Sequence, residues 1–136
     1  MNNFIKTEIV GIDYKVNQNK KSVTCELHGS CVFPGVMLNR EYFKDKDVTV
    51  HNTCYEVQYT VFGVSRCHPD DDFDIETGVE IAKSRAYKKL FIAVRDDFKK
   101  YAKSLRQLSG DIDLSIEKYN RFIDSEKQYI NKHAGI

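Results

Sequence analysis

The feature that most constrains the fold of this chain is a change in the spacing of its apolar residues near Thr77. Before Thr77, apolar and polar residues alternate in several stretches, as they do in β-strands that bury one face. After Thr77, apolar residues recur at steps of three and four, or of eight where a position is skipped, which predicts one stripe along a helix of about thirty residues. The stripe consists of Val79, Ala82, Ala86, Leu90, Ala93, Tyr101, Leu105 and Leu108. We therefore expect strands first and helices after.

The first alternating stretches predict a β-hairpin. Residues 4–16 and 23–28 flank a segment, 17–20, whose composition is typical of a turn. Gly29 then interrupts the pattern and leaves residues 31–33 as a short strand at most.

The next part of the chain predicts more of the same sheet. Residues 39–47 are charged and are expected to form an exposed loop. Residues 48–53 and 55–64 form either a second strand pair or one long bent strand. One face of the latter is expected to be buried, and it carries Tyr55, Val57, Tyr59 and Val61.

The predicted helix is too long to be covered by the sheet alone. About thirty residues span roughly 45 Å, more than the diameter of so small a domain. The run Ser109-Gly110-Asp111 predicts the end of one helix and the start of another. The second helix would carry Ile112, Ile116, Tyr119, Ile123 and Ile130 on one face. The expected fold is α+β, a single domain over residues 1–136 with a small antiparallel β-sheet in 1–66 and a long antiparallel helical hairpin in 75–133.

Apolar residues outside these stripes predict a homodimer or a higher homo-oligomer. They are Phe91, Ile92, Val94 and Phe98 on the first helix, and Phe122 and Tyr129 on the second. Exposed apolar surface of this kind commonly marks an interface between subunits. The alternative is a monomer in which the sheet covers them.

Charge and composition exclude several classes of function. A formal net charge of +1 argues against a general binder of DNA or RNA, which would be strongly basic. No apolar run is long enough to cross a bilayer, and the first residues lack the apolar centre of a signal peptide. We expect a cytosolic protein whose four cysteines are free thiols.

The junction between the last strand and the helix, residues 63–86, is the candidate site. Thr77 and Glu80 fit a capping box that would start the helix. Phe73 stands alone in an acidic cluster made of Asp70, Asp71, Asp72 and Asp74. A strand end, this loop and a helix N-terminus together predict a small-molecule site. The alternative is a well-capped connection in which Phe73 is only a hydrophobic plug.

Basic residues follow the helix at intervals of three, four or seven. They are Arg85, Lys88, Arg95, Lys99, Lys103 and Arg106. Such a stripe is commonly a solvated face. If it converges on the loop at Phe73, it could bind phosphates, with Arg66 completing the grip from the strand side.

The sequence offers only weak signals for metal binding or catalysis. Cys25, His28 and Cys31 are ligand types, but Cys25 shares the parity of the predicted core and His28 does not. We expect no metal and no cofactor. Cys67 and His68 are adjacent on an extended segment, so they point to opposite faces and are poorly placed to share a proton. Two of the clustered aspartates could act as acid and base, although no known catalytic motif surrounds them.

The central run resembles a family of small phage proteins. Val64-Ser-Arg-Cys-His-Pro-Asp-Asp-Asp-Phe-Asp, then Gly78, Ala82 and Arg85-Ala86, are similar to the type-one Thoeris anti-defence proteins. The resemblance implies a sponge that sequesters, without cleaving, a cyclic ADP-ribose isomer (1''-2' or 1''-3' glycocyclic ADP-ribose) and so inhibits Thoeris immunity in the host bacterial cytoplasm. It also implies oligomers built from dimers, some of which take up cyclic oligonucleotides at a second site.

The resemblance implies roles for residues of the junction. Phe73 would stack on the base, Asp72 or Asp74 would accept ribose hydroxyls, and Arg66, Arg85 and Lys88 would meet the pyrophosphate. His68 and Thr77 complete the candidate set within this segment, and Arg95 and Arg106 join it on charge alone. Two other functions stay open: an enzyme that degrades a cyclic nucleotide signal, and a helical module that binds a protein partner.

Overall fold

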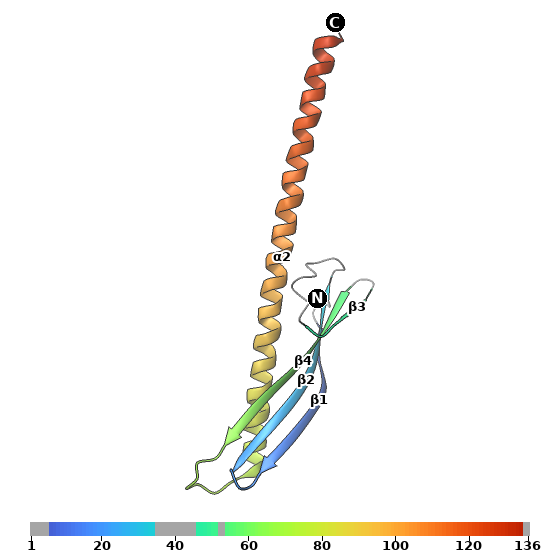
Figure 1. The fold of residues 1–136 in the computed structure, drawn as a ribbon. Helices are drawn as coiled ribbons and strands as arrows, with labels where there is room; N and C mark the ends of the chain where they lie inside the picture. Colours follow the sequence, from blue (N-terminus) through green and yellow to red (C-terminus); the bar gives the residue numbers. More distant parts are fainter. Residues whose placement is uncertain (1–5, 35–45, 52–53, 135–136) are drawn as a thin grey trace. The chain divides into compact units, whose positions relative to one another are not determined.

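The computed structural model describes residues 6–34, 46–51 and 54–134. The elements in order are strands β1 (Lys6–Asn17), β2 (Ser22–Pro34), β3 (Val48–Val50) and β4 (Cys54–Arg66), and helix α2 (Ile75–His133) (Figure 1). The chain divides into two compact units, Met1–Lys99 and Lys100–Ile136. The α+β class and the order of strands before helix are confirmed.

The strands form one antiparallel sheet in the order β1-β2-β4-β3. β1 and β2 form the predicted hairpin, in which Asn17 pairs with Ser22. β2 and β4 pair along their whole length, from Ser22 opposite Arg66 to Pro34 opposite Cys54. β3 pairs with the start of β4, which confirms a strand pair there and not one bent strand. Most of the predicted loop 39–47 lies outside the described residues.

The predicted interruption at Gly29 is wrong, because β2 continues through it to Pro34. A Cβ on Gly29 would lie 3.0 Å from each terminal methyl group of Leu90. Glycine at this position therefore makes room for the helix and does not end the strand.

The core of the first unit lies between one face of the sheet and the first half of α2. Alternate residues of β2, among them Val23, Cys25 and Leu27, are fully buried, as their parity predicts. The helix contributes residues of the predicted stripe and, in addition, Val94: the buried apolar side chains of α2 in this unit are Ala82, Ala86, Leu90 and Val94. The Phe98 ring stacks on Phe33 with 4.3 Å between ring centroids. The sheet thus covers two of the side chains that the sequence suggested for a subunit interface.

The expected helical hairpin is not found, because α2 continues as one helix through Ser109, Gly110 and Asp111. Gly110 does not adopt the left-handed conformation that ends helices. In a helix interior, glycine costs only about 1 kcal/mol relative to alanine, and no proline follows to stop the helix. The Ser115 hydroxyl donates to the Asp111 carbonyl at 3.1 Å, four residues earlier in the same helix.

No helix among the described residues combines the length and the apolar character needed to cross a membrane.

Candidate anion-binding site

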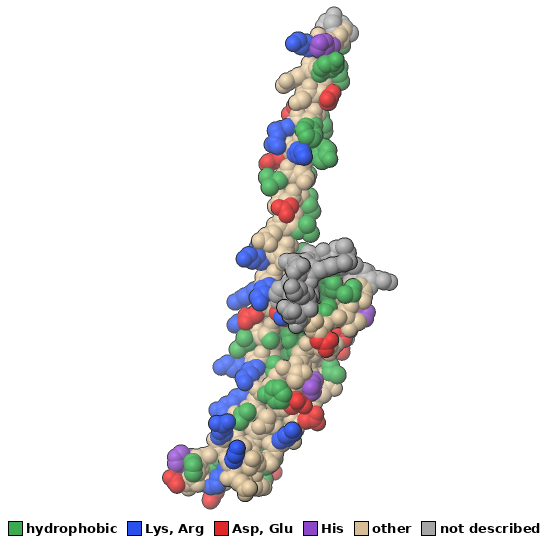
Figure 2. Space-filling view, viewed as in Figure 1, with side chains coloured by type: hydrophobic (Ala, Val, Ile, Leu, Met, Phe, Trp, Pro, Cys, Tyr) green, Lys and Arg blue, Asp and Glu red, His purple; other side chains and the backbone are tan. Residues whose placement is uncertain are grey.

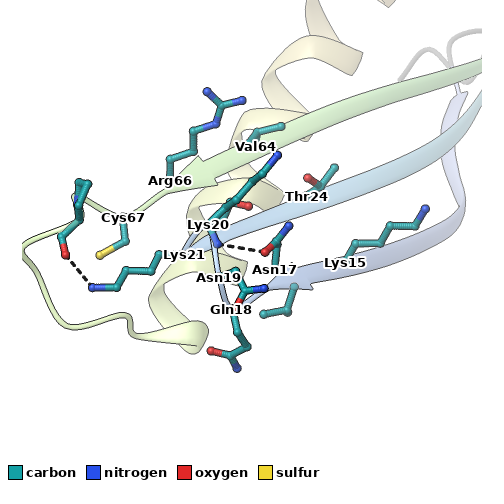
Figure 3. A pocket seen from close by; sticks show the side chains of 13 residues that line it. Lys15, Asn17, Gln18, Asn19, Lys20, Lys21, Thr24, Val64, Arg66 and Cys67 are labelled. Atoms are coloured by element: carbon teal, nitrogen blue, oxygen red, sulfur yellow. Dashed lines mark hydrogen bonds between the residues drawn. The ribbon is translucent and has the colours of Figure 1, made fainter.

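A groove with a volume of about 1080 Å³ lies where the β1–β2 turn meets the end of β4 (Figure 3). Four cationic side chains line it: Lys15, Lys20, Lys21 and Arg66. The other described lining residues are Val16, Asn17, Gln18, Asn19, Ser22, Thr24, Val64, Cys67 and Pro69, so none of them is Asp or Glu. Cations and amides without a carboxylate make this groove a candidate site for an anion.

The strand register explains why these cations line the same groove. Lys15 pairs with Thr24 across β1 and β2, and Thr24 pairs with Val64 across β2 and β4. Arg66 lies opposite Ser22, immediately after the turn. These residues share the parity opposite to the buried Val23 and Cys25, so they occupy the face of the sheet that does not pack on α2.

Hydrogen bonds of Lys21 connect the segment after β4 to the β1–β2 turn. Its backbone is left-handed, with φ of 48°. Its ammonium group donates to the carbonyls of Pro69 at 2.9 Å and Asp71 at 2.6 Å. Its own carbonyl accepts the amide of Cys67 at 2.8 Å. Among the described residues, none of the carboxylates pairs with Lys15, Lys20 or Arg66, so these three can meet a bound anion.

The helix start differs from the predicted one. α2 begins at Ile75, and its cap is Asp74 instead of Thr77. One Asp74 carboxylate oxygen accepts the amides of Glu76 at 3.1 Å and Thr77 at 3.5 Å, and the other accepts the Thr77 hydroxyl at 2.7 Å. These hydrogen bonds, the Thr77 hydroxyl first, hold the pKa of Asp74 below its ordinary value. The predicted capping box of Thr77 and Glu80 is therefore wrong, because a better acceptor stands one turn earlier.

The remaining residues of the acidic loop are placed as follows. Phe73 is half-buried, and its ring lies 3.5 Å from the position that a Cβ on Gly78 would take. Asp72 is exposed, and its carbonyl accepts the Cys67 thiol at 3.5 Å. His68 is exposed beside Asp70, whose amide donates to His68 Nδ1 at 3.2 Å.

The basic residues of the helix lie outside the groove. Lys and Arg side chains gather along one side of α2 beside the sheet (Figure 2). Arg85 and Lys88 line a second hollow of about 650 Å³, together with Glu76, Thr77, Glu80, Ile81 and Ser84. Arg95 lines a third hollow and pairs with Asp96 at 3.1 Å. Arg106 is exposed in the second unit.

Val64 connects the first two hollows. Its side chain lines the groove, and its carbonyl accepts a hydrogen bond from Arg85 at 2.6 Å. The structure therefore brings Arg66 together with three lysines and not with Arg85. The sequence reasoning missed Lys15, Lys20 and Lys21. The available signals were the lysines in and beside the β1–β2 turn and the arginine at the end of a later strand, β4.

The predicted placement of Cys25 and His28, two residue types that bind zinc, on opposite faces of the strand is confirmed. Cys25 and Cys31 are buried in the core, whereas His28 is on the other face of β2. There, ligand atoms of His28, Asp13 and Glu26 lie within 4.8 Å of one another. His28 Nε2 is 3.2 Å from a Glu26 carboxylate oxygen, and Nδ1 is 3.0 Å from the Thr60 hydroxyl. These are ligand types for a divalent cation, on an exposed sheet face.

Comparisons with known proteins give no match: no protein family, no curated protein and no solved structure is significantly similar to this chain.

Proposed function

We propose that this protein is a sponge for a cyclic ADP-ribose isomer, which it sequesters without cleavage so as to inhibit Thoeris immunity in the host bacterial cytoplasm. The observation that supports this function is the groove lined by Lys15, Lys20, Lys21 and Arg66 without a described carboxylate. A cyclic ADP-ribose carries its negative charge on a pyrophosphate, and charge-assisted hydrogen bonds to fixed cations are the strongest polar contacts available for it.

The groove also offers groups for the uncharged parts of such a ligand. The turn presents the side-chain amides of Asn17, Gln18 and Asn19, which can bond ribose hydroxyls or base edges. Val16 and Val64 add an apolar surface. In the junction, Asp72 is the better candidate for a ribose contact, because both carboxylate oxygens of Asp74 already cap the helix.

Binding is favoured over cleavage by the chemistry of the lining. Hydrolysis at neutral pH commonly needs a carboxylate or an imidazole as general acid or base. The described residues that line the groove include neither. The Cys67 thiol donates to the carbonyl of His68 at 3.4 Å, an arrangement that does not activate it as a nucleophile.

The proposal extends to assembly and to other ligands. We expect a homodimer or higher homo-oligomer, since large apolar side chains such as Phe91 remain exposed. Cyclic oligonucleotides at a second site belong to the same proposal. The hollow lined by Arg85 and Lys88 is the place we would test first.

The test measures binding of purified protein to cyclic ADP-ribose isomers by calorimetry, for the wild type and for Lys20→Glu and Arg66→Glu. Each reversal should weaken binding about tenfold or more, since a hydrogen bond to a charged group contributes about 1.5–3 kcal/mol. Lys89→Glu is the matched control, because Lys89 is an exposed helix lysine and does not line the groove.

Denaturing the loaded protein by heat and recovering the bound nucleotide then distinguishes a sponge from an enzyme. A sponge returns the intact ligand, whereas an enzyme returns a product. Ligand at a hundredfold its dissociation constant should stabilise the fold by about 2.7 kcal/mol. A helical interaction module would show no stabilisation by any nucleotide, and that result would refute the proposal.

A further inference from the structure

The second unit carries an apolar seam that nothing described covers. Every residue from 105 to 134 is exposed, including large apolar side chains (Figure 2). Ile112, Ile116, Ile123 and Ile130 are exposed by 52%, 54%, 52% and 58%. An isolated helix in water is marginally stable, and helices in proteins are held chiefly by packing of an apolar face. This face therefore requires a partner.

The spacing of the seam is that of a coiled coil. From Ile112 the apolar positions follow steps of four, three and four to Ile123, and a step of seven leads to Ile130. That is the alternating pattern of heptads, which keeps one seam turned toward a second helix. Phe122 and Tyr129 flank the seam on one side. Glu126 occupies the skipped position, and a single polar residue in a seam specifies register at some cost in stability.

The charges of the segment are separated along its length. Residues 111–117 contain three acids, Asp111, Asp113 and Glu117, and no cation. Residues 127–132 contain two lysines, Lys127 and Lys132, and no acid. A parallel pair in register would place like charges at the same level. An antiparallel pair would place each acidic end beside a basic end, and the two helix dipoles would also oppose each other.

We propose that residues 105–133 pair antiparallel with the same segment of a second copy of this chain, about a two-fold axis beside Arg121 and Phe122. Ile112 then lies level with Ile130 of the second copy, and Tyr119 lies level with Ile123. In the same register, Asp113 lies level with Tyr129 of the second copy, two residues from Lys127, which occupies the same flanking position of its heptad. The contact is isologous, so it closes as a dimer and does not propagate. This inference is independent of the ligand.

Sedimentation of the full-length chain tests the seam. Ile116→Glu should raise the dissociation constant of the dimer about tenfold or more, because it places a charge in the seam. Leu114→Glu is the matched control, since Leu114 is 64% exposed but lies on the opposite side of the helix from the seam. A monomeric wild type, or equal dissociation by both variants, would overturn the proposal.

Charge exchange tests the orientation. Asp113→Lys and Lys127→Asp should each weaken the dimer, and the double variant should restore it, because the exchanged charges again face each other in an antiparallel pair. A parallel pair, or a different protein as the natural occupant, predicts no restoration, and that outcome would also overturn the proposal.

Discussion

Gly63 of β4 lies against Ala86 of α2 without space for a side chain between them. The position that a Cβ on Gly63 would take is 3.1 Å from the Ala86 Cα, and it also collides with the Ala82 carbonyl and the Ala86 amide. Gly63 and the two alanines thus allow the helix to lie directly on the strand. This contact fixes the height of the helix over the sheet.

Gly63→Ala is therefore expected to destabilise the protein. The colliding atoms belong to the helix backbone and cannot move aside, so the free energy of unfolding should fall by about 1–3 kcal/mol. Urea titration followed by circular dichroism measures the change. Gly110→Ala is the control, because a Cβ there meets nothing within 4 Å and should raise helix stability by about 1 kcal/mol. Equal effects of the two substitutions would contradict the close contact.

Tyr59→Phe is expected to destabilise the first unit. The Tyr59 hydroxyl donates to a carboxylate oxygen of buried Asp97 at 2.6 Å, and the Lys46 ammonium lies 3.0 Å from the other oxygen. Loss of a hydrogen bond to a buried charge costs about 1.5–3 kcal/mol. Thermal unfolding should show the loss for Tyr59→Phe and little change for Tyr87→Phe, which keeps the half-buried ring of Tyr87 beside Phe91. Unchanged stability of Tyr59→Phe would show that the Asp97 carboxylate does not need the hydrogen bond from Tyr59.

The Asp74 cap predicts a dependence of stability on acid pH. The pKa of Asp74 is lowered in the folded state by the Thr77 hydroxyl and by the Thr77 and Glu76 amides. Its contribution is therefore complete above its ordinary pKa of 3.8 and is lost as the pH falls below that value through the folded pKa. Asp74→Asn keeps a good cap but removes the titration.

The free energy of unfolding, measured as a function of pH, should thus fall less steeply below pH 3.8 in Asp74→Asn than in the wild type. The pKa of Glu56 is also lowered, first by the hydrogen bond from His51 and then by those from Ser30 and Gln58, and Glu56 is present in both proteins. The difference between the two curves isolates Asp74. Parallel curves would mean that the charged and the protonated carboxyl group of Asp74 cap the helix equally well.

Phe73→Ala tests whether the junction takes part in ligand binding. We expect the variant to lose retention of a cyclic ADP-ribose while it keeps its fold and assembly, because in the proposed complex Phe73 would supply the aromatic surface for the base. Retention is measured by dialysis of the loaded protein. Unchanged retention would confine the ligand to the groove at the hairpin turn, since Phe73 packs on the first turn of α2 near Gly78.

Local patterns predicted much of the first unit correctly. The alternation of Val23, Cys25 and Leu27 identified the buried face of β2, and the spacing of Ala82, Ala86 and Leu90 identified the buried face of α2. Such patterns are reliable because burial on one face imposes the period of the element itself. The predicted helix break at Gly110 failed because a glycine has the same sequence signature inside a helix and at its end.

The sequence by itself determined that strands precede a helix and which residues of β2 and of the first turns of α2 face the core, since these follow from local periodicity. Only the tertiary structure decided that Arg66 joins Lys15, Lys20 and Lys21 in one groove while Arg85 bonds the Val64 carbonyl instead. The reason is the strand register. It brings the turn after β1 beside the end of β4, more than forty residues away along the chain, and no local pattern records which residues will meet there.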